Sequence, residues 1–353
     1  MTLHIPADDL THYCARIFAS AGSSPEEAQA VAASLVDSNL TGHDSHGVIR
    51  VPRYVNWVKT GELIPNQTPA SVIDTPAFAV LDGRFGYGQI MAPKAVDIGV
   101  EKARALGLGA VSLRNSGHIG RVGEWAERAA AVDLISIHFV NAAGSILVAP
   151  FGGLERRLST APFCAGLPRE GAPALILDFA TSLVAEGKVR VASQGGKPLP
   201  PDALIGPDGA LSGDPSLLYG PLTADNPGDH LHGVGAIRAF GEHKGSGLAL
   251  ICELLGGSLT GNGATEPDRR FANGMFSLYI DPKRVDPGHV FDADMARYLQ
   301  WFSQAKPIPG QEILTPGEPE RRARAQRRAN GVPLPEEVWE AINATARALG
   351  VTG

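Results

Sequence analysis

The fold class is decided by residues 92–140, which read APKAVDIGVEKARALGLGAVSLRNSGHIGRVGEWAERAAAVDLISIHFV. Apolar residues at helical spacing predict helices over Ala92–Leu106 and Val122–Ala131, and short apolar runs predict strands over Ala110–Leu113 and Leu134–Val140. Helices that alternate with strands favour an α/β or α+β protein over an all-β one. We therefore expect a central α/β domain around this stretch.

Further strands and helices extend this domain along the chain. Leu175–Asp178 and Met275–Ile280 are strand candidates, and Lys244–Leu259 is predicted to be a strongly apolar helix. Gly195–Asp229 is rich in Gly, Pro and Asp and has no sustained periodicity, so we expect a surface loop with short elements there. The central domain is predicted to span residues 76–282.

Both ends of the chain are predicted to be helical. Ser24-Pro25-Glu26-Glu27 combines an N-cap, a proline at the first helical position and a capping-box glutamate. Further helices are expected over Val51–Lys59, over Met295–Phe302 and from Pro335 onward. The simplest arrangement is a helical layer made from residues 1–75 and 283–353, packed around the central domain.

Length and composition restrict the function classes. The chain has 353 residues, 44% hydrophobic and 19% charged, which excludes disorder for most of it. A net charge of -6 offers no basic surface, so nucleic acid is not expected as a partner. No apolar run has the length of a membrane span and no secretory leader is visible, so we expect a cytoplasmic protein without a membrane partner. Three widely spaced cysteines, Cys14, Cys164 and Cys252, encode neither a disulfide framework nor a thiolate metal site.

The common nucleotide-binding motifs G-x-G-x-x-G and G-x-x-x-x-G-K-[ST] are absent. Gly117, Gly120 and Gly123 follow one another at a spacing of three, between a predicted strand and a predicted helix. Their amides could bind an anion at the helix start, or the glycines could simply make a tight turn. The glycines alone do not separate these two interpretations.

The densest polar cluster is His43-Asp44-Ser45-His46, followed by Arg50. A histidine passes protons near neutral pH and the planar fork of an arginine binds a carboxylate, which together suit the reduction of a 2-oxo acid. The alternatives are a surface turn capped by Asp44 or Ser45, and an ion pair between Arg50 and a protein carboxylate. His43 and His46 would need a third ligand to hold a metal, and no residue is spaced to provide one, so no metal is predicted.

Three further segments carry polar groups at the ends of predicted elements. Asp178, Thr181 and Ser182 follow a buried strand, where α/β enzymes bind ligands, although the two hydroxyls are equally suited to capping a helix. Lys244 lies at the start of the apolar helix, where the helix dipole favours a pyrophosphate; a solvated lysine is the alternative. Thr315-Pro316-Gly317-Glu318 is by itself only a turn and a helix start.

Taken in order, six segments resemble the malate/L-lactate dehydrogenase family of NAD(P)-dependent 2-hydroxy-acid oxidoreductases: DSHGVIRVPRY, SGHIGRVGEWA, APFGG, LDFATS, GEHKGSGLAL and TPGEPERRARAQR. The resemblance spans nearly the whole chain, and the hydroxycarboxylate dehydrogenases of the family are the most similar in appearance. It implies a non-Rossmann α/β fold, a nicotinamide cofactor, NAD or NADP, and a homodimer. The absence of G-x-G-x-x-G is consistent with this implication.

The resemblance also implies roles for particular residues. Ser45, His46 and Arg50 are implied to line the substrate pocket, with Arg50 as the carboxylate clamp. His46 is implied to donate the proton to the substrate oxygen, and His118, at a position to which some family members assign the acid/base, competes for that role. The residues implied to contact the cofactor are Asn141, Asp178, Phe179, Ala180, Thr181, Ser182, Lys244, Gly245, Pro316, Gly317 and Glu318. Asn273-Gly274-Met275 departs from the family pattern, so no substrate contact is transferred to that strand.

The function expected from these features is hydride transfer between the nicotinamide and a small 2-hydroxy or 2-oxo acid, with a histidine moving the hydroxyl proton. A cyclic imino-acid reductase is the first alternative, because it would use the same hydride and the same clamp. A non-catalytic relative that only binds a ligand is the second. The sequence does not specify the substrate side chain, the stereochemistry, or the choice between NAD and NADP.

Overall fold

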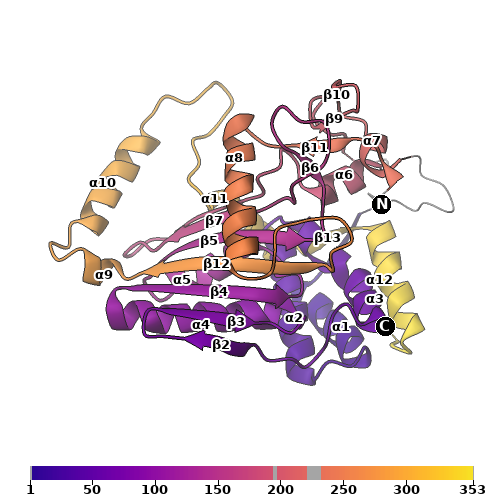
Figure 1. Ribbon diagram of the computed structural model, residues 1–353, viewed down its shortest axis with the longest axis horizontal. Coiled ribbons are helices and arrows are strands. Elements are labelled where there is room, and N and C mark those ends of the chain that lie inside the picture. The colour runs from indigo at the N-terminus through magenta and orange to yellow at the C-terminus, as the bar shows by residue number, and fades with distance from the viewer. Residues whose placement is uncertain (1, 194–196, 221–231, 353) are drawn as a thin grey trace.

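A seven-stranded sheet runs through the middle of the molecule in the order β2-β3-β4-β12-β5-β7-β8 (Figure 1). The computed structural model describes residues 2–193, 197–220 and 232–352. Strands β3 and β4 are parallel, because α4 (Gly88–Leu106) crosses between them, and the other pairs of this sheet are antiparallel. The predicted α/β class is confirmed. The strands are β2 (Ala70–Asp74), β3 (Phe78–Asp82), β4 (Leu108–Ser116), β5 (Ile135–Ala143), β7 (Phe163–Leu167), β8 (Leu175–Phe179) and β12 (Ala272–Ile280).

Different elements cover the two faces of this sheet. On one face, α4 and α5 (Val122–Ala130) bury alternate strand residues such as Val111, Leu113 and Met275. On the other face stand α8 (His243–Cys252) and a π-helical segment, Glu253–Leu259 (Figure 1). The sequence predicts one helix over Lys244–Leu259, and the structure widens its second half, which lets the backbone of the segment pack directly onto β5 and β12.

The helical layer contains α1 (Ala7–Ser20), α2 (Pro25–Leu40), α3 (Val51–Thr60) and α12 (Glu336–Ala348). The two chain ends also pair as strands, β1 (Thr2–Ile5) with β13 (Val332–Pro335). The predicted cap of α2 is confirmed, since the Glu27 amide donates to Ser24 Oγ at 3.2 Å. The Glu27 carboxylate accepts from the Asn66 amide at 2.9 Å, which ties the cap to the segment before β2.

The segment after β12 differs from the expected grouping of residues 283–353 with the helical layer. Short α9 (Pro282–Val285) and α10 (Phe291–Ser303) lie at the opposite end of the sheet from α1, α3 and α12 (Figure 1). The chain then returns, and α11 (Glu318–Asn330) packs against α2. The difference arises because β12 runs antiparallel to β4 and β5 and therefore ends far from the layer.

A small lobe with its own apolar core lies beyond the α8 face. It contains the strands β6 (Val148–Ala149), β9 (Leu204–Ile205), β10 (Leu211–Ser212) and β11 (Ala236–Arg238) and the helices α6 (Glu186–Ser193) and α7 (Ser216–Tyr219). The expected loop over Gly195–Asp229 is therefore partly an ordered lobe, while its residues 195–196 and 221–229 lie outside the described ranges. In the part of the chain that is described, no helix is both long and apolar enough to cross a membrane.

Candidate active site

The segment from Ser45 to Arg50 is folded into two short 3-10 helices, η1 (Asp44–His46) and η2 (Val48–Arg50), between α2 and α3. Asn39, near the end of α2, determines this shape, because its Oδ1 accepts the Val48 amide at 2.8 Å. A Cβ at Gly47 would lie 2.1 Å from the same Oδ1, so only glycine fits there. The local sequence thus holds the serine, the histidine and the arginine in a fixed arrangement.

The two candidate proton donors lie together. His118 follows β4, and its ring stacks on that of His46 with a centroid distance of 5.4 Å and an interplanar angle of 12°. Each Nδ1 is hydrogen-bonded to a hydroxyl, His46 to Ser45 Oγ at 3.1 Å and His118 to Tyr54 Oη at 2.6 Å. Neither Nε2 has a partner among the described residues, and neither is a buried atom, so both are open to a ligand.

The electrostatic surroundings keep both histidines neutral. Burial, reinforced by the positive charge of Arg50, lowers the pKa of His46 to about 3. The same two causes lower the pKa of His118 well below the usual value. The titration near neutral pH that an unperturbed histidine would give is therefore not expected from the free protein.

Arg50 projects into the same space from the start of α3. Its Nε donates to the Ser45 carbonyl at 2.6 Å, which fixes the plane of the guanidinium. Its Nη2 lies 3.9 Å from Glu186 Oε2, and the Glu186 carboxylate also accepts from the Tyr219 hydroxyl at 2.9 Å. The expected alternative, an ion pair with a protein carboxylate, is thus present as a long contact. It leaves the outer guanidinium nitrogens available to bind a substrate carboxylate.

The end of β8 places Asp178, Phe179 and Ala180 next to the start of two helices. Asp178 Oδ2 accepts from the Gly123 amide at 2.7 Å at the beginning of α5, and burial raises the pKa of its carboxyl. The Phe179 ring meets the Phe240 ring edge-on at 5.2 Å, just before α8 begins. The strand end and the α8 start, which are 60 residues apart in the chain, therefore share one surface.

Thr181 and Ser182 extend this strand end with their hydroxyls turned inward. Thr181 Oγ1 donates to the Ala161 carbonyl at 2.9 Å, and Ser182 Oγ donates to the Val184 carbonyl at 2.9 Å. Both residues are buried. They shape the strand end, and their hydroxyls are not directed toward a ligand.

The start of α8 is suited to an anion. Lys244 is exposed in the first turn, and Glu242 precedes the helix without a side-chain cap, so no side-chain acceptor occupies the start of the helix. A Cβ at Gly245 would lie 1.9 Å from the Phe240 carbonyl oxygen, so a glycine is needed for this close approach. A pocket opens beside this turn, lined by Phe151, Leu154, Ile205, Leu211, Arg238 and Glu242 among others.

The predicted contribution of the C-terminal segment is placed against β8. The Pro316 carbonyl accepts from the Ile176 amide at 3.2 Å, and Gly317 takes a positive φ of 86° to begin α11. Glu318 accepts from Arg322 at 2.6 Å. Pro316 and Gly317 thus lie against Ile176, in the first half of β8.

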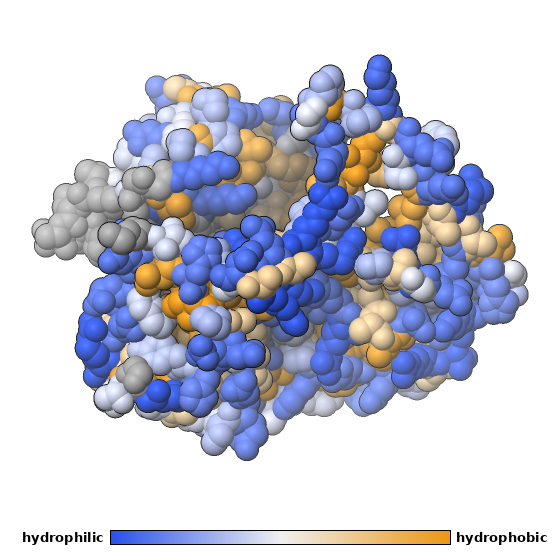
Figure 2. Space-filling view, turned by 180° about the vertical axis from the view of Figure 1, so that it is seen from behind, coloured by the Kyte–Doolittle hydropathy of each residue, from blue (hydrophilic) through white to orange (hydrophobic). Residues whose placement is uncertain are grey.

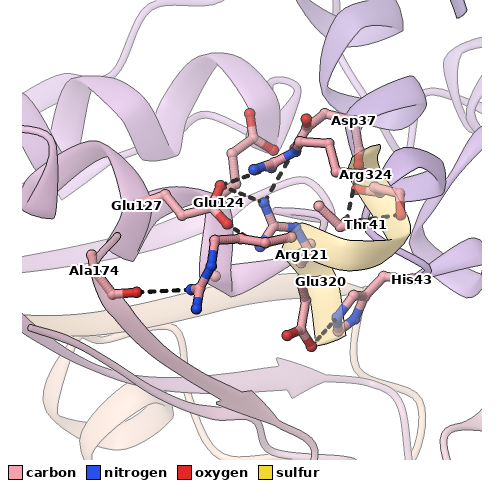
Figure 3. Close-up of polar contacts among 12 residues, drawn as sticks. Asp37, Thr41, His43, Arg121, Glu124, Glu127, Ala174, Glu320 and Arg324 are labelled. Carbon is pink, nitrogen blue, oxygen red and sulfur yellow. Dashed lines mark hydrogen bonds and ion pairs between the residues drawn. The ribbon is translucent and has the colours of Figure 1, made fainter. Parts of the chain in front are cut away.

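A buried ionic cluster anchors the loop that carries His118. Arg121, only 1% exposed, donates to Asp37 at 3.2 Å and to Glu127 at 2.8 Å. Arg324 of α11 joins the same two carboxylates, at 2.9 and 3.0 Å (Figure 3). The cluster connects α2, α5 and α11, so the loop is fixed from three sides.

A second set of ionic contacts holds the other side of the site. His43 Nε2 lies 3.3 Å from Glu320 of α11 (Figure 3), and Arg327 of the same helix binds the Asp44 carboxylate. Asp44 is therefore an ion-pair partner of α11 and not a helix cap. No group of three metal-ligating side chains occurs within the described ranges, and His43 turns to Glu320.

Asn141 does not fit the cofactor role that the resemblance implies. Its side chain is fully buried, with both amide hydrogens donated, to Glu253 at 3.1 Å and to the Gly263 carbonyl at 2.8 Å. Its Oδ1 accepts from Asn262 at 3.1 Å and from the Gly274 amide at 3.2 Å. The residue joins β5, β12 and the π-helical segment, and no polar atom of its side chain remains for a ligand.

Sequence reasoning missed three residues of the site. Tyr54 and Gln89 lie behind His118, and Glu186 lies opposite Arg50. Tyr54 had a usable signal, because it follows Arg50 by four residues on one helix and must share its face. Gln89 and Glu186 had none, since only the tertiary structure brings α4 and α6 to this place.

Comparisons with known proteins identify the family of the chain. The malate/L-lactate dehydrogenase family model matches residues 5–343. Hydroxycarboxylate dehydrogenase B of Escherichia coli K12 is 38% identical over 98% of this chain and 94% of its own length. A Delta(1)-pyrroline-2-carboxylate reductase of Ancylobacter novellus is 30% identical over 96% of this chain and 95% of its own. A solved E. coli structure, described as a malate/lactate dehydrogenase, superposes with a TM-score of 0.91 at 37% identity, covering 99% and 96% of the two chains.

The matched family and relatives define the chain as an oxidoreductase of the dehydrogenase class. The chain belongs to the malate/L-lactate dehydrogenase family. The resemblance noted in the sequence is thereby confirmed, together with the expectation of a 2-hydroxy-acid dehydrogenase that uses a nicotinamide cofactor.

Proposed function

We propose that the pocket between η1, η2 and the His118 loop binds a 2-oxo or 2-hydroxy acid, with Arg50 on its carboxylate and the His46–His118 pair at its C2 oxygen. The observation that carries this proposal is the convergence of two stacked imidazoles with open Nε2 atoms and an arginine whose Nε is fixed by Ser45. The clamp orients the acid, and an imidazole moves the hydroxyl proton as hydride passes to or from C2.

The residues present fit a nicotinamide dinucleotide along β8 and α8. The uncapped first turn of α8, with Lys244 and the close approach at Gly245, would hold the pyrophosphate. Asp178, Phe179 and Ala180 would border the half of the cofactor that faces the histidines, and the 316–318 turn would border β8 from its other side. The cofactor supplies the hydride, and the protein positions it.

An assay of cofactor oxidation against a panel of 2-oxo acids tests the proposal. We expect turnover with at least one small 2-oxo acid and none with the matching ketone or aldehyde that lacks the carboxylate, because the clamp would have nothing to hold. Turnover that does not depend on the carboxylate would remove Arg50 from the proposed role.

We propose NAD over NADP as the preferred cofactor. Arg238 lies in the pocket beside α8 and is paired with two carboxylates, Asp202 at 3.1 Å and Glu242 at 2.6 Å. Two carboxylates on one guanidinium leave a net negative charge, which repels a ribose 2′-phosphate and favours a 2′-hydroxyl.

Titration with NADH and NADPH should show tighter NADH binding. Glu242→Gln should narrow the difference in affinity between the two cofactors, while Glu155→Gln, on an exposed pair, should not. Tighter NADPH binding would refute the preference.

Reduction of a cyclic imino acid is the second candidate function. The relative from Ancylobacter novellus is named as a pyrroline-2-carboxylate reductase, and a C=N bond next to a carboxylate would fit the same clamp. A panel that contains both 2-oxo acids and cyclic imines separates the two functions. A kcat/KM for an imine above that of every 2-oxo acid tested would favour the second.

We propose that the protein is a homodimer. None of the described residues of α10 is buried, and Tyr298 and Trp301 are 50% and 65% exposed. Leu250 and Ile251 of α8 are also exposed, at 52% and 44%. Figure 2 shows apolar side chains among hydrophilic ones at the right of the view, the side on which α10 lies. Light scattering should give twice the chain mass, and Trp301→Glu should lower it while Leu211→Glu in the small lobe should not.

We also propose that the protein works in the cytoplasm. Cys14, Cys164 and Cys252 are all buried and unpaired, and burial raises the pKa of each thiol, which suits a reducing compartment. Cell fractionation with an antibody against the chain tests this location.

A further inference from the structure

We propose that Tyr54 and Gln89 are positioning residues that hold His118 with its proton on Nε2, so that His118, and not His46, delivers the proton to the substrate oxygen. The inference rests on the proposed function for its chemical consequence. The arrangement of hydrogen bonds that it describes exists in the free protein and can be measured there.

The direction of the hydrogen bonds follows from counting hydrogens. Gln89 Nε2 donates to Tyr54 Oη at 3.1 Å, and Tyr54 Oη lies 2.6 Å from His118 Nδ1. Tyr54 is fully buried, and its hydroxyl hydrogen has no acceptor within the described ranges other than His118 Nδ1. With Gln89 Nε2 as the donor to Tyr54, the hydroxyl donates to Nδ1, which is then unprotonated, and the ring proton is on Nε2.

His46 has no corresponding control. Its Nδ1 faces Ser45 Oγ at 3.1 Å, and no described group donates to that hydroxyl to fix its direction. Ser45 can therefore donate to the ring or accept from it, and both tautomers of His46 are compatible with the structure. Only the His118 ring has a tautomer that its hydrogen bonds fix, so we assign the proton transfer to His118.

The fixed tautomer allows a complete proton transfer without a charged ring. With a reduced nicotinamide to supply hydride to C2, the carbonyl oxygen would take the proton from Nε2, and the Tyr54 hydroxyl proton would move to Nδ1. The substrate gains one hydride and one proton, the ring changes tautomer, and the negative charge ends on Tyr54 Oη. There it accepts hydrogen bonds from Gln89 and from Nδ1–H. After product release Nδ1 returns its proton to Tyr54, and Nε2 takes one from water.

The surrounding charges favour this transfer. The positive charges of Arg50 in η2 and Arg53 in α3 oppose a positive His118 ring, as does burial, while His46 on its other side stays neutral. The same two arginines lower the pKa of Tyr54, against burial, which raises it to about 12. The hydroxyl is thus protonated before the reaction and lies next to positive charge when it becomes anionic.

Nitrogen NMR of the free protein tests the inference directly. In protein with ¹⁵N-labelled histidine, assigned through His118→Asn, we expect His118 to show a protonated Nε2 and an unprotonated Nδ1 from pH 6 to 8. Tyr54→Phe should abolish this preference, and Gln89→Leu should weaken it. Tyr87→Phe is the matched control, because that ring lies 6.0 Å from the Tyr54 ring and Tyr87 forms no hydrogen bond with His118.

Kinetics then test the consequence. Tyr54→Phe should lower kcat about tenfold or more and Gln89→Leu by a smaller factor, with the KM for the 2-oxo acid nearly unchanged. A protonated Nδ1 in the wild-type spectrum would mean that Gln89 accepts from Tyr54, and it would overturn the inference, as would a Tyr54→Phe spectrum identical to wild type. Absence of all turnover in the wild type, with the expected spectrum, would instead count against the proposed function.

Discussion

Around His46 and His118, each Nδ1 is bound by a hydroxyl and the Arg50 Nε by a carbonyl, whereas at the start of α8 Lys244 is exposed and the first turn has no cap. The first region, which we call the histidine corner, is held by α2, α3, α11 and the His118 loop. The second is an open surface shared by β8 and α8. A rigid corner suits atoms that must be placed accurately for chemistry, and an open surface suits a ligand that must enter and leave.

The largest effect is expected from removing the proposed proton donor. His118→Asn should lower kcat by about 10²–10⁴-fold, the usual contribution of general acid–base catalysis, because the amide cannot deliver the proton. His46→Asn should cost less, and the unfolding temperature of both variants serves as the control. The reverse ranking would assign the proton to His46, and a loss below tenfold in both would exclude the pair from proton transfer.

The clamp is expected to have the next largest effect. Arg50→Lys should lower kcat/KM for 2-oxo acids by about 10- to 150-fold, equivalent to ~1.5–3 kcal/mol for a charge-assisted bidentate contact that an ammonium cannot reproduce. Cofactor affinity should be retained. Arg53→Lys, on the same helix and over the Trp57 ring at 5.2 Å, is the matched control and should have the smaller effect. A loss for Arg50→Lys no larger than that for Arg53→Lys would mean that the guanidinium fork of Arg50 makes no bidentate contact with the substrate carboxylate.

On the open surface shared by β8 and α8, we expect a substitution to change the affinity for the cofactor alone. Lys244→Ala should raise the cofactor Kd about tenfold, at the low end of ~1.5–3 kcal/mol for a charge-assisted contact because the lysine is exposed, with kcat nearly unchanged. Lys283→Ala on α9, another exposed lysine, should leave the titration as it is. A fall in kcat without a change in Kd would break the contrast between the two regions.

The parts of the fold that the sequence predicts are those governed by local patterns. The alternation of helices and strands in residues 92–140 and the cap at Ser24 depend on neighbours in the chain, and the structure confirms both. The widening of the helix after Cys252 and the place of α10 depend on distant contacts. Nothing near these segments in the sequence distinguishes them from ordinary helices.

The same distinction separates the site residues. His46 and Arg50 stand out because reactive side chains are concentrated in one short segment, and the structure brings them next to His118. Asn141 is assigned to the cofactor by the resemblance alone, and the structure shows that its side chain donates to the buried carboxylate of Glu253. Gln89 is invisible in the sequence, since its role consists of one hydrogen bond to a residue 35 positions away.

The smallest effect is expected at a histidine, His138, that is buried but has no proposed role in the chemistry. His138 lies in β5 with its ring nitrogens on Ser277 Oγ at 2.8 Å and Ser136 Oγ at 3.0 Å, and burial lowers its pKa to about 3. The unfolded chain binds a proton on this histidine below pH 6.5 and the folded chain does not, so the free energy of unfolding falls as pH decreases. Between pH 6.5 and 5.5 this residue alone should change the free energy of unfolding by about 1 kcal/mol.

Urea denaturation of the wild type and of His138→Gln, whose amide does not titrate, measures how differently the free energy of unfolding of the two proteins depends on pH. Because His138 is remote from the histidine corner, the variant should keep wild-type kcat at neutral pH, which would show that a depressed pKa alone does not identify the site. A large loss of kcat would contradict this conclusion.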